Sequence, residues 1–91
     1  MIERQTEHSE EMERINSPHY RVNFWSRQSE EFGWNLDAYL LDDALSINEV
    51  LTWAVLRADG RSYEVFAVIT VGSTDETMLV RLVGTNPNRS V

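Results

Sequence analysis

The chain has 91 residues, carries a net charge of −7 and contains no cysteine. This length leaves room for one hydrophobic core, and the missing cysteines exclude disulfide bonds, thiolate metal sites and cysteine nucleophiles. All eight basic residues are arginines that stand singly along the chain, so we expect binding neither to nucleic acid nor to an anionic membrane.

Residues 1–18 form an acidic segment with a net charge of −3, and its few apolar residues do not recur at helical spacing. We therefore expect a disordered acidic tail, with an arm that orders on a partner as the alternative. Nearly all other apolar residues lie within residues 19–86, which we expect to form a single α/β domain, followed by a flexible C-terminus at residues 87–91. Since no signal-peptide core and no membrane span is found, we expect a cytoplasmic protein.

Two strands are expected at the start of the domain. Residues 20–26 alternate, with Tyr20, Val22 and Phe24 on one face, and residues 35–41 alternate in the same way. The polar segment 27–33 between them is typical of a loop. An antiparallel hairpin with a long loop explains this pattern best.

A helix is expected over residues 47–59. Ser46 and Glu49 have the spacing of a capping box, in which each side chain accepts a hydrogen bond from the backbone N–H of the other residue. Gly60 is expected to end the helix, because glycine enters the left-handed conformation without steric cost. The apolar residues between these ends recur along one stripe: Ile47, Val50, Leu51, Ala54, Val55 and Ala58.

Two more strands follow the helix. Residues 62–71 are the most β-prone run of the chain, residues 72–76 supply turn residues, and residues 77–83 form the last strand. The order predicts an α+β fold of type ββαββ, in which one four-stranded sheet carries a single helix on one face.

Catalytic groups are sparse. His8 lies in the tail and His19 at the edge of the domain, and neither has a recognisable triad partner in the sequence. The adjacent acids at 30–31 and at 42–43 fall on loop or extended segments, where neighbouring side chains point apart. We therefore expect no enzyme activity, no metal site and no cofactor.

The apolar residues exceed what one helix can cover. The helix is expected to cover the sheet face that bears Val22, Phe24, Leu36, Leu40, Val65 and Ile69. The opposite face would then keep Trp25, Tyr39, Leu41, Phe66, Val68, Leu79 and Val83. On the helix, Trp53 and Leu56 lie away from the apolar stripe and are expected to be at least partly exposed. Monomeric proteins rarely expose such patches, so we expect a second copy, another protein or a small ligand to cover the second face. A cover formed by the tail or by the 27–33 loop is the alternative.

The leading interpretation is a non-catalytic protein-interaction module, homodimeric or bound to another protein, with an unknown biological role. Its interaction residues are expected to be Trp25, Tyr39, Leu41, Trp53, Leu56, Phe66 and Val68. One alternative is a small-ligand-binding domain in which Trp34 and Tyr39 line the pocket. Another is an immunity- or antitoxin-type protein, whose negative charge steers association with a basic partner. Stacking of nucleic-acid bases on the sheet aromatics is disfavoured, because flanking positive charge is missing.

Four segments carry a resemblance to known sequences. They are Tyr20-Arg21-Val22-Asn23-Phe24-Trp25, Gly33-Trp34-Asn35-Leu36-Asp37-Ala38-Tyr39, Glu49-Val50-Leu51-Thr52-Trp53-Ala54 and Leu79-Val80-Arg81-Leu82-Val83-Gly84. In these segments the chain resembles a group of small uncharacterised actinobacterial proteins, over about residues 20–87. The resemblance implies a bacterial origin, which the all-arginine basic set fits, and it implies no activity, ligand or partner.

Overall fold

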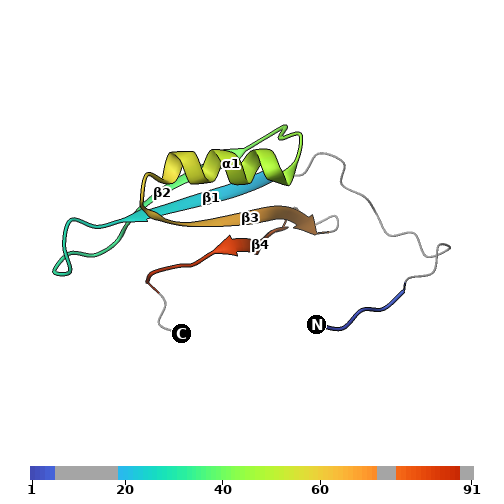
Figure 1. Cartoon of the computed structure of the whole chain (residues 1–91), viewed down its shortest axis with the longest axis horizontal. Helices are drawn as coiled ribbons and strands as arrows, with labels where there is room; N and C mark the ends of the chain where they lie inside the picture. The colour runs from blue at the N-terminus through green and yellow to red at the C-terminus, as the bar shows by residue number, and fades with distance from the viewer. Residues whose placement is uncertain (6–18, 72–75, 89–91) are drawn as a thin grey trace.

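The computed structural model describes residues 1–5, 19–71 and 76–88 (Figure 1). The tail predicted for residues 1–18 therefore lies outside the described residues from residue 6 on. A flexible end was predicted for residues 87–91, and its residues 89–91 also lie outside the described residues. Positions 72–75 of the predicted turn lie outside them as well.

The element order confirms the predicted α+β fold. Strands β1 (His19–Ser26) and β2 (Asn35–Leu41) precede helix α1 (Ile47–Ala58), and strands β3 (Ser62–Val71) and β4 (Glu76–Gly84) follow it. The strands form one antiparallel sheet in the order β2-β1-β3-β4. Helix α1 lies along one face of this sheet, above β1 (Figure 1). Every predicted strand and the predicted helix is present, with ends that differ by a residue or so.

The core lies between α1 and the two central strands. Its buried members on the sheet include Val22 and Phe24 of β1 and Val65 of β3, and α1 contributes Val50 and Ala54. The predicted apolar stripe of the helix thus faces the sheet, except for Val55, which is 58 % exposed and was wrongly assigned to it. Because residues at alternate positions of a strand share a face, this core defines the helix side of the sheet.

The register of the first hairpin corrects the expected faces of β2. Val22 lies opposite Tyr39, and Trp25 lies opposite Leu36. Residues directly opposite each other point to the same face, so Tyr39 and Leu41 lie on the helix side, where they pack against the core. Leu36 and Leu40 lie on the opposite face, so the prediction for this strand was wrong. Strand β2 carries apolar residues at both alternating positions, and a shift of one residue in register exchanges its faces.

A similar correction applies to the end of β4. Val83 lies opposite Val65 and therefore belongs to the helix side, not to the opposite face. The pairing of β3 with β4 has a register irregularity between Val65 and Phe66, and the extra residue, Leu82, changes the alternation of β4 at this point. Leu79, which precedes the irregularity, lies opposite Val68 on the face away from the helix, as predicted.

The start of α1 carries the predicted cap with one difference. The Ser46 hydroxyl accepts a hydrogen bond from the Glu49 N–H at 3.2 Å. The Glu49 carboxylate reaches back to the N–H of Leu45 at 3.2 Å rather than to that of Ser46. At the other end, the helix stops one residue earlier than predicted, because Asp59 already has a left-handed conformation with φ of 48°, followed by Gly60 with φ of 83°.

Replacing Ser46 by alanine is expected to lower the free energy of unfolding by about 1 kcal/mol, because the Glu49 N–H loses its acceptor. Urea denaturation followed by circular dichroism measures this loss. Ser46→Asn is the matched control, since asparagine also caps a helix, and it should stay close to the parent protein. Equal losses in both variants would contradict a capping role for the Ser46 hydroxyl.

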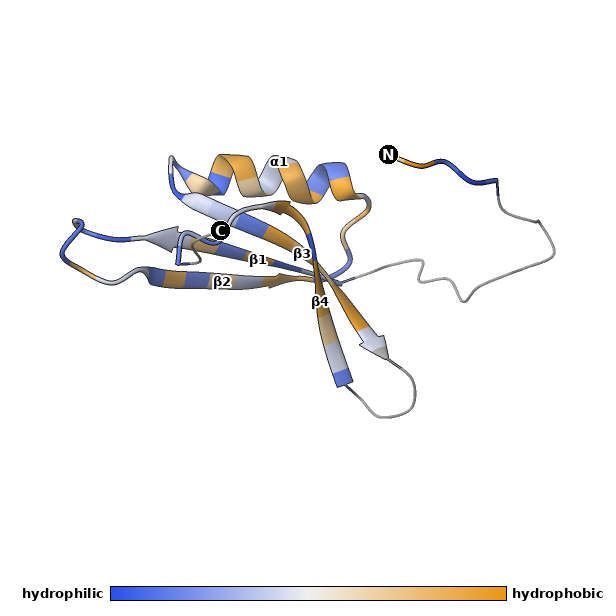
Figure 2. Cartoon of the chain, turned by 90° about the horizontal axis from the view of Figure 1, so that it is seen from below, coloured by the Kyte–Doolittle hydropathy of each residue, from blue (hydrophilic) through white to orange (hydrophobic). Residues whose placement is uncertain are grey.

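Helix α1 leaves part of the sheet uncovered even on its own side. In Figure 2, the outer halves of β3 and β4 extend away from α1 as a projecting hairpin. All nine residues of β4 are exposed. The helix therefore protects the centre of the sheet, and the β4 edge lies beyond its reach.

Candidate interaction surface

The sheet face opposite α1 is called the open face here, and cross-strand pairing defines its members. From β1 and β3 it carries Arg21, Asn23, Trp25, Glu64, Phe66 and Val68, and from β2 and β4 it carries Leu36, Ala38, Leu40, Leu79 and Arg81. Of the predicted interaction residues, Trp25, Phe66 and Val68 thus lie on this face, each of them half-buried.

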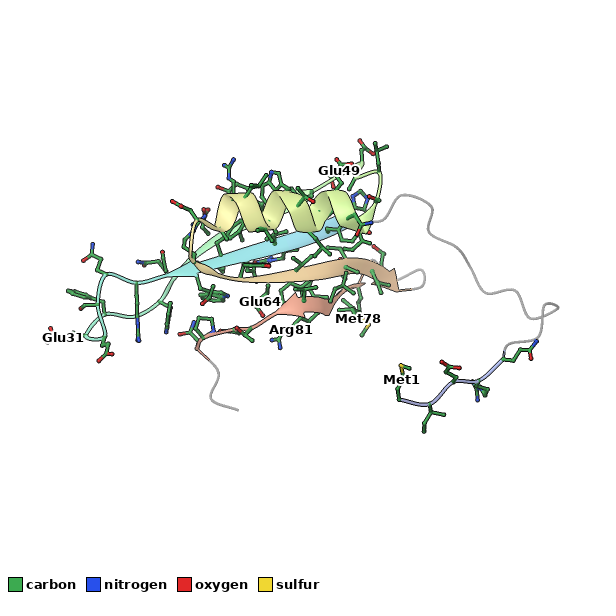
Figure 3. All side chains as sticks on the ribbon, viewed as in Figure 1. Met1, Glu31, Glu49, Glu64, Met78 and Arg81 are labelled. Atoms are coloured by element: carbon green, nitrogen blue, oxygen red, sulfur yellow. The ribbon has the colours of Figure 1, made fainter. Side chains whose placement is uncertain are left out.

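A polar network occupies the middle of the open face. Glu64 is only 1 % exposed, although in the described part of the chain no helix lies on this face. Its Oε1 accepts hydrogen bonds from Trp25 Nε1 at 2.9 Å and from Asn23 Nδ2 at 3.4 Å. Its Oε2 forms an ion pair with Arg81 Nη2 at 3.1 Å. Figure 3 shows Glu64 and Arg81 on the side of the sheet away from α1.

This network links three strands through one carboxylate. A buried carboxylate is stable only when its oxygens are paired, and β1 supplies two of the donors while β4 supplies the third. Arg21 Nε in turn donates to Asn23 Oδ1 at 2.9 Å, which extends the network along β1. Beside Glu64 lies a hollow of about 530 Å³, which is lined by Asn23, Trp25, Glu64, Phe66, Leu79, Arg81 and Asn86.

The open face is therefore less apolar than the sequence predicted. Its centre is polar, and the polar groups there form hydrogen bonds and an ion pair with one another. The expectation that apolar residues cover this face continuously was therefore wrong. Sequence reasoning missed the network, because Glu64 and Asn23 are 41 residues apart and meet only through strand pairing. The available signal was a single acidic residue within an otherwise apolar strand, since such a residue is seldom buried without partners.

Exposed apolar side chains gather instead on β4. Five of its residues are between 37 % and 55 % exposed: Met78, Leu79, Val80, Leu82 and Val83. Met78 and Val80 pair with Ile69 and Ala67 on the helix side, and Leu79 points to the open face. Strand β4 thus exposes apolar side chains on both of its faces.

Three predicted interaction residues belong to the helix side. The rings of Tyr39 and Trp53 meet edge to face with centroids 5.4 Å apart, and both contact the ring of Phe24. The Arg57 guanidinium lies over Tyr39 and Trp53, at 5.0 Å and 5.6 Å from the ring centroids. It also donates a hydrogen bond to the Tyr39 hydroxyl, which raises the pKa of Arg57. With Leu41, these rings pack against the core and lie away from the open face.

Leu56 is the exception on the helix. It is 77 % exposed on the outer surface of α1, as its position on the helical wheel predicted. Trp53 was also expected to be at least partly exposed, and it is half-buried, because its long ring system reaches over the Tyr39 side chain.

The residues predicted for a ligand pocket lie far apart. Tyr39 packs beneath α1, whereas Trp34 lies in the loop before β2 with the Arg27 guanidinium 4.4 Å above its ring. Five residues of extended chain separate them, which corresponds to roughly 16 Å along the strand. Trp34 lines a separate hollow of about 400 Å³ together with Trp25 and Arg61. Trp34 and Tyr39 therefore do not line one common pocket in this fold.

The described histidine lies at the surface of the domain. His19 Nδ1 lies 2.6 Å from Asp42 Oδ1, and both side chains are more than half exposed to solvent. Among the described residues, no group of three or more histidine, cysteine or acidic side chains is placed to hold a metal ion. Within the same ranges, no helix is long and apolar enough to cross a membrane.

Comparisons with known proteins add no relative. No protein-family model matches the chain, and neither a curated protein nor a solved structure does.

Proposed function

We propose that this chain is a non-catalytic protein-interaction module that associates with a second copy of itself. The observation that carries the proposal is the exposed apolar surface of β4, which continues onto the open face through Leu79. Full burial of one aliphatic side chain contributes about 1.5–3 kcal/mol. Several partly exposed ones from each copy together can offset the loss of rotational and translational freedom on association.

The charge distribution supports a second copy as the partner. The chain as a whole carries −7, but β4 contains one acid and one base, Glu76 and Arg81. On the open face, Arg21, Glu64 and Arg81 sum to +1. Two copies therefore meet at this surface without the repulsion that like charges cause. The exposed acids elsewhere in the described part of the domain lie in the first loop, within and after β2, and at the ends of α1: Glu30, Glu31, Asp37, Asp42, Asp43, Glu49 and Asp59.

The test compares two single substitutions in the full chain. We expect the parent protein to sediment as a dimer at micromolar concentration. Leu79→Glu should shift it to monomer, because the new carboxylate lies on the association surface in both copies. Leu56→Glu is the matched control, since it places the same charge on the outer surface of α1 and should leave the dimer unchanged. Circular dichroism establishes that both variants are folded.

Two outcomes would overturn the proposal. A parent protein that sediments as a monomer across the micromolar range excludes self-association as the function. A dimer that dissociates in Leu56→Glu and persists in Leu79→Glu places the interface on the helix instead of on the sheet.

A further inference from the structure

Strand β4 has the position of an edge strand and the composition of a central one. It stands at the end of the strand order β2-β1-β3-β4. Edge strands are commonly protected by lysine, proline or inward-pointing charges, because their free backbone groups can pair with another chain. Residues 76–84 contain no lysine or proline, and both faces of the strand are apolar. Beside Glu76, Thr77 and Arg81, the strand carries apolar side chains on both faces, which is typical of a strand whose two faces are both buried.

The other edge of the sheet shows the contrast. Strand β2 carries Asn35 at its start and Asp37 on the helix side, where Arg61 Nη1 donates to the Asp37 carboxylate at 3.3 Å. Tyr39 and Leu41 of β2 are covered by α1 and the core. Strand β2 is thus covered on its helix side, although it exposes Leu36 and Leu40 on the open face. Strand β4 is exposed at all nine of its residues, its charged residues are Glu76 and Arg81, and no other element of the described residues covers it.

We propose that β4 pairs antiparallel with β4 of a second copy, so that two four-stranded sheets join into one sheet of eight strands. This inference rests on the proposed self-association and specifies its geometry. The pairing is symmetric about a two-fold axis perpendicular to the sheet, so each residue faces a residue of the second copy on the same side of the sheet. Both helices then lie on one side of the joined sheet.

The side chains of β4 favour one register, in which Leu79 faces Leu79 of the second copy on the two-fold axis. Met78 then faces Val80 on the helix side, and Thr77 faces Arg81 on the open face. Next to the axis, apolar residues meet apolar residues, a polar residue meets a polar one, and no like charges are opposed. Farther from the axis, Glu76 falls opposite Leu82, the extra residue of the register irregularity. A register centred on Met78 would instead place Glu76 against Val80, and one centred on Val80 would place Arg81 against Leu79.

Because the chain contains no cysteine, a single introduced cysteine reports this register directly. Directly opposed residues of antiparallel strands have Cα atoms roughly 4.5–5.5 Å apart, which is within the range of a disulfide. Leu79→Cys is therefore expected to form a disulfide-linked dimer under mild oxidation. Leu36→Cys is the matched control, because Leu36 is 47 % exposed on the same face at the other edge, against 44 % for Leu79. We expect Leu79→Cys to cross-link at least roughly tenfold faster, since pairing raises the effective concentration of the two thiols.

A mixture of two variants tests the register independently of Leu79. In a dimer of Met78→Cys alone, or of Val80→Cys alone, the two introduced thiols are offset by two residues along the paired strands. This offset is too large for a disulfide. Mixed together, they are directly opposed and should form a dimer that contains one chain of each. This pair of measurements supports the proposed register only if the mixture cross-links and each single variant does not.

The outcomes separate this inference from the proposal on which it rests. If the parent protein is a dimer and none of the three single variants nor the mixture of Met78→Cys with Val80→Cys cross-links faster than Leu36→Cys, the edge pairing is wrong and self-association stands. If the parent protein is a monomer, both are wrong. Cross-linking of Met78→Cys alone, without cross-linking of Leu79→Cys, would overturn the register and replace it with one centred on Met78.

Discussion

Replacing Phe24 by alanine is expected to unfold most of the domain at room temperature. Truncation of a buried phenylalanine costs about 3–5 kcal/mol of unfolding free energy. A domain with a core this small retains only a few kcal/mol of net stability. The loss is therefore comparable to the whole stability, and the circular dichroism spectrum of the variant should lose its native signal.

Phe24 is placed to have this effect because it lies at the centre of the core. Its side chain has no exposed surface, and its ring contacts the rings of Tyr39, Trp53 and Tyr63 at centroid distances of 5.8, 5.7 and 6.5 Å. The Arg61 guanidinium lies 4.5 Å from the ring centroid. Phe32→Ala is the control, because Phe32 is 56 % exposed in the first loop and its truncation should cost little. Comparable unfolding midpoints for the two variants would show that the aromatic cluster does not hold the fold.

The second large effect is expected from Glu64→Ala. Removal of the carboxylate leaves the Trp25 indole N–H and the buried Asn23 amide without their acceptor, and it leaves Arg81 without its ion pair. An unsatisfied buried polar group costs about 1–3 kcal/mol. Arg81 adds less than a buried charge would, since 43 % of its side chain is exposed and can be solvated. We expect a loss of about 2–3 kcal/mol in the free energy of unfolding, measured by urea denaturation.

Two further variants identify the cause of this loss. Glu64→Gln keeps an oxygen acceptor and removes the charge, so it should lose less stability than Glu64→Ala. Glu31→Ala removes an exposed acid from the first loop and should leave stability nearly unchanged. If Glu64→Ala were no more destabilising than Glu31→Ala, the network would not contribute to holding the three strands together.

Most of the fold could be predicted from local signals in the sequence. The cap at Ser46, the apolar stripe of α1 and the alternation in β1 each depend on residues within one element, and the structure confirms them, apart from Val55 of the stripe. The faces of β2 could not be predicted in this way. Its apolar residues occupy both alternating positions, so only the pairing with β1 decides that Tyr39 faces the helix and Leu40 faces away.

The candidate surface was less predictable, because it depends on contacts between distant strands. Trp25, Phe66 and Val68 were placed on the correct face, since their own strands alternate clearly. The polar network around Glu64 needs partners from β1 and β4, and no local pattern links these positions. The exposure of β4 depends on how far one helix of 12 residues reaches across the sheet, which becomes visible only when the strand order is known.

The way in which β4 is attached also has a consequence for how the molecule opens. Strand β1 is flanked by two strands and covered by α1, whereas β4 is held by its ladder with β3 and by the link from Arg81 to Glu64. Regions with little apolar burial open locally at a free energy well below that of global unfolding. In the monomer, the backbone amides of β4 should therefore exchange with solvent sooner than those of β1. A strand that detaches while the core stays folded also allows associated copies to exchange subunits without unfolding.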